Sequence, residues 1–369
     1  MIDLLSIDID KIHRPFGNKN LKENTKTGIV RLKQLSDKVQ LYPDANHIIV
    51  TSSDNGTRIN IRCSPLKPLQ GHNVFGTDHV IGLGYKLIQF VLDNLGIVAS
   101  ASELRAWERG EYKLREIHLT YHFGLPSHAL LKPLVTHILR TIHVQYRPAF
   151  IKTGVGITLQ SPTPHVEWML YDKLQWMKDM RHKEYGRLLA LVCDEKTADD
   201  IWQHLLKAAA SALRMELRLF EQYLKTNGLD EPAKWPKGKP REIFLKELAS
   251  LRLGKVPALE SVLPLLNALR DDQRLRQTFR LWMIGDDIQT YCSASTARSH
   301  RRRIEELTGI DILLDRPPLQ SQFDLAALFH QENIVPKHPD WIEQYPQAYY
   351  QGGGLEDVRL LSPYCASSC

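Results

Sequence analysis

The sequence predicts an α+β protein built on an antiparallel sheet, and three observations support this. The elements of the first 170 residues follow the order strand, strand, helix, strand, helix, strand, strand, which is typical of that class. An Asn-Gly turn joins the first two of these strands into a hairpin. Apolar residues make up 43% of the 369 residues and charged residues 24%, as in an ordinary globular protein of one or two domains.

The hairpin is predicted from HIIVTSSDNGTRINIRC, because Asn55 and Gly56 readily adopt the positive φ that its turn, Ser53 to Gly56, requires. Apolar residues at helical spacing then predict an amphipathic helix from Val80 to Leu95 that ends near Gly96. The next elements are predicted as a strand over 116–123, a helix over 128–142, a loop at YRPAF, and strands over 154–159 and 166–170.

The chain is mainly helical after residue 195, with a strand over 213–219 and a basic, proline-containing stretch, WPKGKPR, that reads as a linker. Beyond the linker, IQTYCSASTARSHRRRIEELTGIDIL has the rhythm of a helix-turn-helix. Helices are predicted over 196–210 and near 243–251, 259–269 and 274–283. A short helix that runs through residue 224 is predicted after the strand over 213–219. The chain is predicted to divide into a first domain over 1–230, a linker over 231–241, a helical region over 242–330 and a tail over 331–369.

The charge of the chain favours an anionic partner without requiring one. Lys and Arg number 48 against 42 Asp and Glu, which gives a net charge of +6. The start of the chain lacks the features of a secretion signal, and the most apolar stretch is interrupted by Asp93, so neither secretion nor a membrane span is expected. The 5 cysteines are scattered, which favours reduced thiols in the cytoplasm.

One segment identifies a family. SPLKPLQGHNVFGT, Ser64 to Thr77, closely resembles the SPxKxxQGHNVFG segment of filamentous-phage replication initiators of the gene II/gene X type. Three more stretches fall in the order of that family: REIHLTYHF, HVEWMLYDKL and LRMELRLFEQYLKTNGL. The resemblance covers about residues 1 to 230. It implies a tyrosine endonuclease that nicks one strand at an origin, with a fold related to the double-His (HUH-like) endonucleases.

A divalent metal site is the first implication. On a strand, His118, Thr120 and His122 of REIHLTYHF share one face. The resemblance supplies Glu216 as a carboxylate beside these two histidines, and Mg²⁺ or Mn²⁺ as the cofactor, with imidazole ligands favouring Mn²⁺. Many family members carry Asp where His118 stands. A pair of surface histidines on an edge strand is the alternative.

The second implication is a tyrosine nucleophile. If HVEWMLYDK is a strand throughout, Tyr171 and Lys173 share a face with Glu167. A phenol with a pKa of about 10 needs a cation or base to become nucleophilic at neutral pH. Lys173 is predicted to lower that pKa or to stabilise the charge of the phosphorane. The resemblance implies that Tyr171 forms a 5′-phosphotyrosine and leaves a 3′-OH. A packing role for Tyr171 is the alternative, and Tyr185 or Tyr223 could serve as a second tyrosine.

DNA contacts are predicted at three places. Lys67, His72 and Asn73 could hold a phosphate or a base edge, although a tight turn capped by His72 explains the same residues. Arg214 could orient Glu216 or bind phosphate. A candidate recognition helix carries clustered arginines, for which a solvated helix face is the alternative. These arginines are Arg298, Arg301, Arg302 and Arg303.

Together these features predict an initiator of phage or plasmid rolling-circle replication. It would bind the double-stranded origin and single-stranded DNA, nick one strand, rejoin the displaced strand, and work with a host helicase and polymerase. Whether it forms a homo-oligomer stays open. One alternative is a conjugative or mobilisation relaxase, which would nick at a transfer origin instead of a replication origin. The other is a non-catalytic DNA-binding regulator of replication.

Overall fold

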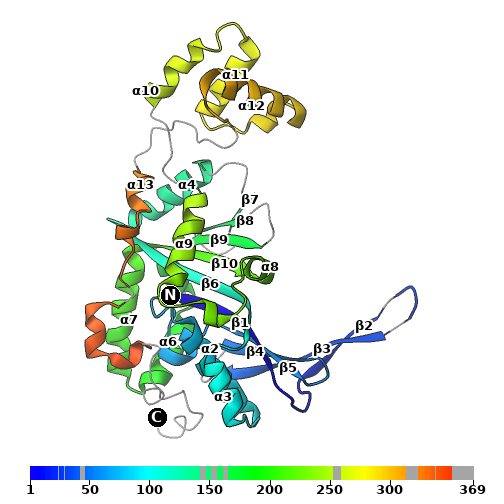
Figure 1. The fold of residues 1–369 in the computed structure, drawn as a ribbon. Coiled ribbons are helices and arrows are strands. Elements are labelled where there is room, and N and C mark those ends of the chain that lie inside the picture. The colour runs from blue at the N-terminus through cyan, green and yellow to red at the C-terminus, as the bar shows by residue number, and fades with distance from the viewer. Residues whose placement is uncertain are drawn as a thin grey trace.

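The computed structural model describes residues 1–23, 25–28, 30–41, 46–141, 147–150, 156–160, 165–251, 259–312, 323–336 and 338–350. Within them, a 10-stranded antiparallel sheet runs through the molecule in the order β2-β3-β4-β5-β1-β6-β10-β9-β8-β7 (Figure 1). The strands are β1 (Ile2–Asp10), β2 (Asn18–Glu23), β3 (Val30–Leu41), β4 (Asn46–Ser53), β5 (Arg58–Cys63), β6 (Lys113–Gly124), β7 (Arg147–Phe150), β8 (Gly156–Gln160), β9 (Val166–Tyr171) and β10 (Ala212–Phe220). The predicted α+β class is confirmed.

The two faces of the central strands differ in character because successive residues of a strand point to opposite faces. In β6, Ile117, Leu119 and Tyr121 are buried among apolar neighbours, whereas the alternate positions are charged or polar. β10 repeats this pattern in ALRMELRLF. The sheet therefore has an apolar face, which forms the main core, and a polar face, which carries the predicted site residues.

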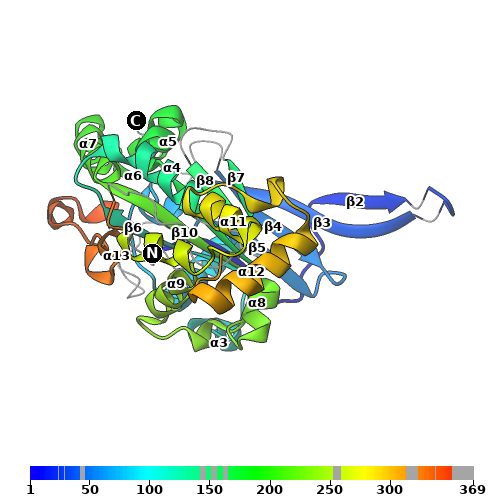
Figure 2. The ribbon, with the colours of Figure 1, turned by 90° about the horizontal axis from the view of Figure 1, so that it is seen from above.

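Helices cover the sheet on both sides. α8 (Glu221–Thr226) and α9 (Lys239–Ser250) lie on one side, and α5 (Lys173–Asp179) and α7 (Glu195–Ala210) lie on the other (Figure 2). The main core also takes residues from α2 (Val80–Leu95), whose ends are fixed by the His79 side chain at the N-cap and by Gly96 at the C-cap. The remaining helices are α1 (Leu66–Gln70), α3 (Ala101–Glu108), α4 (Leu131–Thr141), α6 (Arg181–Val192), α10 (Leu259–Val262), α11 (Gln273–Met283), α12 (Ala294–Thr308) and α13 (Leu325–Leu328).

Two smaller clusters complete the packing. The first joins α5, α6 and α7 to Val74 and Phe75 and to Ile342 and Ala348 near the end of the described chain. The second lies in the lobe formed by α10, α11 and α12, which stands apart from the sheet in Figure 1. No helix among the described residues combines the length and the apolar composition needed to span a membrane.

Most predicted elements are confirmed. The helix over Val80–Leu95 has the predicted bounds. The β4–β5 hairpin turns through Asp54, Asn55 and Gly56 at φ of 51°, 57° and 86°, as its turn sequence predicts.

Several elements were not predicted, among them β2, β3, α1 and α3, and three further departures have an identifiable cause. The central strand β1 was not predicted, because a β-bulge near Asp3 interrupts the alternation of its apolar residues. The YRPAF loop contains β7, a short strand at the sheet edge, where its proline is tolerated. Helices α5 and α6 were also missed, and the glycine within α6, Gly186, weakens its helical signal.

The stretch predicted as a linker, 231–241, lies against the body of the sheet domain. Trp235 is 2% exposed, and its indole Nε1 donates to the Leu229 carbonyl at 2.8 Å. The following helix α9 then places Ile243 and Phe244 in the main core. The described chain therefore leaves the sheet only after α9, while the predicted functional division between the regions stays a prediction.

Two helical glycines provide a matched test of the packing. A Cβ at Gly84 in α2 would lie 2.0 Å from the hydroxyl of Tyr112, whereas a Cβ at Gly186 in α6 would meet nothing within 4 Å. We expect Gly84→Ala to lower the free energy of unfolding by about 1–3 kcal/mol through overpacking. Gly186→Ala should raise it by up to about 1 kcal/mol through helix propensity. Urea denaturation measures both, and equal effects would contradict the packing of α2.

Candidate active site

The predicted residues form rows across the polar face of the sheet. The register places His122 of β6, Arg214 of β10 and Tyr171 of β9 in one row. Glu216 lies opposite Thr120, and Arg218 lies opposite His118. Directly opposed residues share a face, so β6, β10 and β9 present one continuous polar surface. This agrees with the face predicted for the two histidines and adds Tyr171 and Arg214 to it.

Arg214 lies at the centre of this surface and is 0% exposed. One guanidinium nitrogen, Nη1, donates to the Asn73 carbonyl at 2.8 Å, and the other, Nη2, forms an ion pair with Asp3 Oδ1 at 2.9 Å. The guanidinium carbon lies 5.6 Å from the centre of the Tyr171 ring. Its Nε has no hydrogen-bond partner among the described residues. A buried cation thus lies beside the candidate nucleophile with one donor unused.

Asp3 is a functional candidate that sequence reasoning missed. A register shift between Ile2 and Leu4 marks a β-bulge in β1, and Asp3 is the residue within it. Its carboxylate also accepts from the Asn73 side-chain amide at 2.7 Å. The sequence IDLLSIDID gives no clear signal for it, because Leu4 and Leu5 are both apolar and only the structure shows which of them continues the buried face.

Lys173 is not on a strand, so the condition under which it would share a strand face with Tyr171 and Glu167 is not met. β9 ends at Tyr171, and Asp172 caps α5 by accepting from the Gln175 backbone N–H at 2.9 Å. Lys173 is therefore the first residue of α5, 1% exposed, with Nζ donating to Asn73 Oδ1 at 2.8 Å. Nζ also lies 3.9 Å from the centre of the Trp176 ring. Burial, with the charge of Arg214, lowers the pKa of Lys173 well below its usual value.

Tyr171 is half-buried, and its hydroxyl has no hydrogen-bond partner within the described part of the chain. Burial raises the pKa of its phenol above the ordinary value, while the positive charge of Arg214 opposes that rise. Arg214 therefore favours the phenolate, which is the more nucleophilic form of a tyrosine.

His118 lies between two carboxylates. Its Nδ1 is 2.9 Å from Glu216 and its Nε2 is 2.7 Å from Glu116. Burial alone would lower the pKa of His118, but the hydrogen bonds to these carboxylates outweigh it and raise that pKa. Arg62 and Arg218 pair in turn with Glu116 and Glu216. The structure thus brings His118 and Glu216 together as predicted, in a row of alternating charges.

The predicted metal set of His118, His122 and Glu216 does not assemble around one ion. The two histidines are four residues apart on a strand, which separates their Cα atoms by about 13 Å. The two carboxylates beside His118 contact different ring nitrogens, so one ion could not reach both of them together with the imidazole. No three His, Cys, Asp or Glu side chains among the described residues form a group that could hold a metal.

Two of the DNA contacts predicted in α1 and the loop after it have structural roles. His72 is 3% exposed, and its Nε2 lies 2.9 Å from the Ala348 carbonyl. Lys67 pairs with Glu184 at 3.3 Å, and Glu184 also pairs with the buried Arg187. Asn73 of this loop contacts Arg214, Asp3 and Lys173, which makes it the link between the loop and the sheet.

The arginine cluster of α12 is largely paired within its own lobe. Arg301 binds Asp311 through two nitrogens, and Arg302 and Arg303 both bind Glu306. Residues 259–312 contain 8 arginines and 8 carboxylates, so this lobe is not basic, contrary to the expectation. The connection from α11 to α12 covers residues 284–293, longer than the three or four residues typical of a helix-turn-helix.

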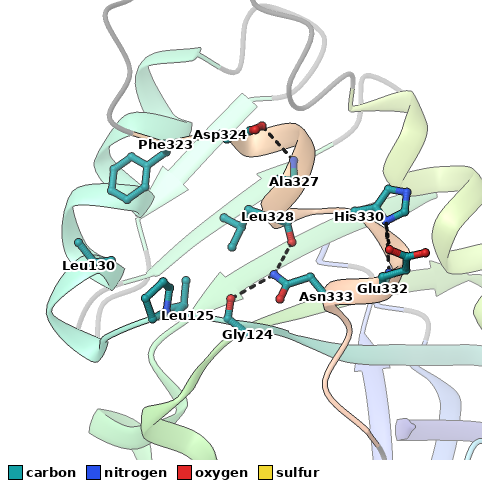
Figure 3. Close-up of a pocket in the computed structure, with 11 residues that line it drawn as sticks. Gly124, Leu125, Leu130, Phe323, Asp324, Ala327, Leu328, His330, Glu332 and Asn333 are labelled. Atoms are coloured by element: carbon teal, nitrogen blue, oxygen red, sulfur yellow. Dashed lines mark hydrogen bonds and ion pairs between the residues drawn. The ribbon is translucent and has the colours of Figure 1, made fainter.

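An open hollow of about 720 Å³ lies beyond the end of β6, and Figure 3 shows its lining. Leu125, Leu130, Phe323 and Leu328 form its apolar walls, while Asn333 donates to the carbonyls of Gly124 and Leu328. None of the predicted site residues lines it. The candidate site is therefore the polar face of the sheet, not this hollow.

The ion pair of Asp3 with Arg214 gives a stability prediction. We expect Asp3→Ala to lower the free energy of unfolding by about 3–5 kcal/mol, because it leaves a buried guanidinium without its carboxylate. Asp10→Ala is the control, since it breaks an exposed pair with Arg58 and should cost less than about 1 kcal/mol. Chemical denaturation measures both losses. Similar small losses would show that Arg214 does not depend on Asp3.

Burial lowers the pKa of His72 to about 4, which makes its contribution to stability depend on pH. Below the ordinary histidine pKa the unfolded chain binds a proton at this residue, and the folded chain does not do so until about pH 4. The advantage of wild type over His72→Gln should therefore shrink by about 3 kcal/mol as the pH falls from 7 to 4. Urea denaturation of both proteins across this range measures it, and a constant difference would contradict the burial of a neutral imidazole.

Comparisons with known proteins agree with the resemblance seen in the sequence. The chain is 23% identical over 271 residues to the replication-associated gene 2 protein of Enterobacteria phage I2-2, which covers 71% of this chain and 72% of that protein. No solved structure matches the chain. The family described as the N-terminal part of the replication-associated gene 2 protein matches residues 1–238, from β1 to the residue before α9. Because that match covers well over half of the chain, the protein belongs to the family of phage replication-associated gene 2 proteins.

Proposed function

We propose that this protein initiates rolling-circle replication by nicking one DNA strand with Tyr171. The observation that carries the proposal is the position of Tyr171 at the end of β9, half-buried beside the fully buried guanidinium of Arg214. Membership of a family of replication-associated proteins supports DNA as the substrate. It also favours a replication origin over the transfer origin of a relaxase.

The chemistry is a transesterification. The phenolate oxygen of Tyr171 attacks phosphorus, the bond from phosphorus to the 3′ oxygen breaks, and a 5′-phosphotyrosine and a 3′-OH result. The phenol loses its proton, and the departing 3′ oxygen takes one up. Rejoining reverses these steps without another energy source, since the phosphodiester energy is kept in the tyrosine linkage.

The surrounding residues have distinct roles in this proposal. Arg214 favours the phenolate through its charge, and because it is fully buried it acts on Tyr171 without contacting the DNA. Asp3 and Asn73 position Arg214. Lys173 is buried against Asn73 and Trp176, so we assign it a positioning role instead of direct contact with the reacting phosphate.

The requirement for Mg²⁺ or Mn²⁺ stays a prediction of the resemblance. His118 and Glu216 are the members of the predicted ligand set that lie together. Because the described donors do not surround one ion, the proposed transesterification is assigned to residues of the protein alone. A host polymerase would extend the 3′-OH, and a host helicase would displace the nicked strand.

The test is a search for a covalent protein–DNA adduct. Supercoiled DNA carrying the cognate origin is incubated with the protein in Mn²⁺, in Mg²⁺ and in EDTA, and denaturing gels are run. We expect an adduct with wild type and none with Tyr171→Phe, because only the hydroxyl is removed.

Tyr223→Phe is the matched control, because the Tyr223 hydroxyl donates to Glu247 at 2.7 Å on α9, which covers the opposite side of the sheet. That variant should form the adduct at the wild-type level. An adduct that persists in Tyr171→Phe would assign the nucleophile to another tyrosine, and tight binding without a nick would favour the regulatory alternative. Equal adduct yields in EDTA would overturn the metal requirement.

A further inference from the structure

One projecting element of the sheet carries an excess of positive charge. On the polar face of the sheet, Arg62, Arg115 and Arg218 each pair with carboxylates. The α10–α12 lobe carries equal numbers of both signs. In contrast, β2 and β3, with the sequences NKNLKE and VRLKQLSDKVQL, contain 5 basic and 2 acidic residues. The net charge of +6 is therefore unevenly spread.

These two strands form a ribbon that extends beyond the sheet. β3 pairs with β4 only from Leu35 to Leu41, whereas its earlier part pairs with β2 (Figure 1). Within the described residues, β2 pairs with β3 alone. A two-stranded ribbon is marginally stable by itself, so binding a partner would stabilise it.

The register connects one face of the ribbon to the candidate active site. Lys38 lies opposite Ile49, Ile49 opposite Arg62, Arg62 opposite Ser6, and Ser6 opposite Glu116. Directly opposed residues share a face, and Glu116 contacts His118. Lys38 therefore occupies the face of the sheet that carries His118 and Tyr171.

The same face continues along the ribbon by alternation. Gln34 is opposite Asn20, and a bulge at Lys33 then lets Lys22 pair with Arg31 on the same face as Asn20. The two acidic residues, Glu23 and Asp37, fall at the alternate positions. The face thus holds three basic residues and no acidic one at these positions: Asn18, Asn20, Lys22, Arg31, Gln34, Ser36 and Lys38.

We propose that this face of the β2–β3 ribbon binds the phosphate backbone of duplex DNA that flanks the nick. The register sets a lysine position, 22, directly opposite an arginine position, 31, and like charges at opposed positions are destabilising unless an anionic partner neutralises them. A two-stranded ribbon also fits the DNA major groove, which is about 12 Å wide. The inference rests on the proposed function only for the identity of the nucleic acid.

The sheet sets the spacing between this contact and the nick. β3 and β9 are six strand positions apart, which corresponds to about 29 Å at about 4.8 Å per strand. That distance spans about eight or nine base pairs at about 3.4 Å each. The ribbon would therefore hold the duplex almost one helical turn from Tyr171.

The test measures salt-dependent binding of the full chain to a fluorescent 40-base-pair duplex of random sequence by anisotropy between 50 and 200 mM KCl. The triple variant Lys22→Gln, Arg31→Gln, Lys38→Gln should bind about tenfold or more weakly at 100 mM. Its slope of log K against log salt should become shallower by about 2 to 3, since each phosphate contact contributes about 0.9.

The matched control removes the same charge from exposed helical positions through Lys132→Gln, Lys196→Gln and Lys207→Gln, and it should leave the slope within one unit of wild type. The charge-conserving variant Lys22→Arg, Arg31→Lys, Lys38→Arg should retain binding, which separates charge from folding of the ribbon. Equal slopes for the ribbon variant and wild type, or equal losses for ribbon and control variants, would overturn the proposal. A loss seen with oligo(dT) but not with duplex would overturn the duplex assignment.

A separate readout keeps the two proposals apart. Adduct formation on a six-nucleotide single strand, with three nucleotides on each side of the nick site, should be unchanged in the ribbon variant, because this substrate is too short to reach the ribbon. If wild type forms no adduct, the Tyr171 chemistry fails, while the ribbon assignment is still decided by duplex binding. An adduct lost only in the ribbon variant would contradict the proposed separation of the two sites.

Discussion

The architecture of the candidate site depends on the burial of one guanidinium. Arg214 has no contact with solvent, so protein groups must replace the water that an arginine normally binds. Asp3 supplies the opposite charge, Asn73 supplies a carbonyl, and Tyr171 supplies the face of its ring. These residues come from β1, from the loop after α1 and from the end of β9. A single buried cation thereby fixes three distant segments against β10.

The polar face also helps to set the strand register. In an ordinary two-layer sheet the apolar face alone decides the register, because a slip of one residue would expose the core. Here a slip would also drive Arg218 and Glu216 of β10 into the apolar core and separate Arg62 from Glu116. Both faces of the sheet therefore oppose a one-residue slip of the strand register. This is consistent with a site that requires the opposed polar residues of β6, β10 and β9 to be aligned.

Local signals in the sequence were sufficient for much of the fold. Helical spacing from Val80 to Leu95 and the Asn-Gly turn predicted their elements, and alternation placed His118 and His122 on one face of a strand. The errors arose where tertiary structure decides the outcome. The condition that HVEWMLYDK is a strand through Lys173 fails, although Asp172 followed three residues later by Gln175 is a pattern typical of a helix start. Asp3 was missed because its partner is 211 residues away in the chain.

The loop that supports Arg214 is also held by residues from the far end of the chain. His72 contacts the Ala348 carbonyl, the Gln70 side chain accepts from the Tyr350 backbone N–H at 3.0 Å, and Phe75 stacks against Tyr349. These contacts join positions more than 270 residues apart, so they are among the slowest to form. During synthesis the sheet can assemble as its strands emerge from the ribosome, but this loop reaches its final packing only after Tyr350 has been synthesised. The order of synthesis therefore delays the finished site long after its last strand, β10, has been made.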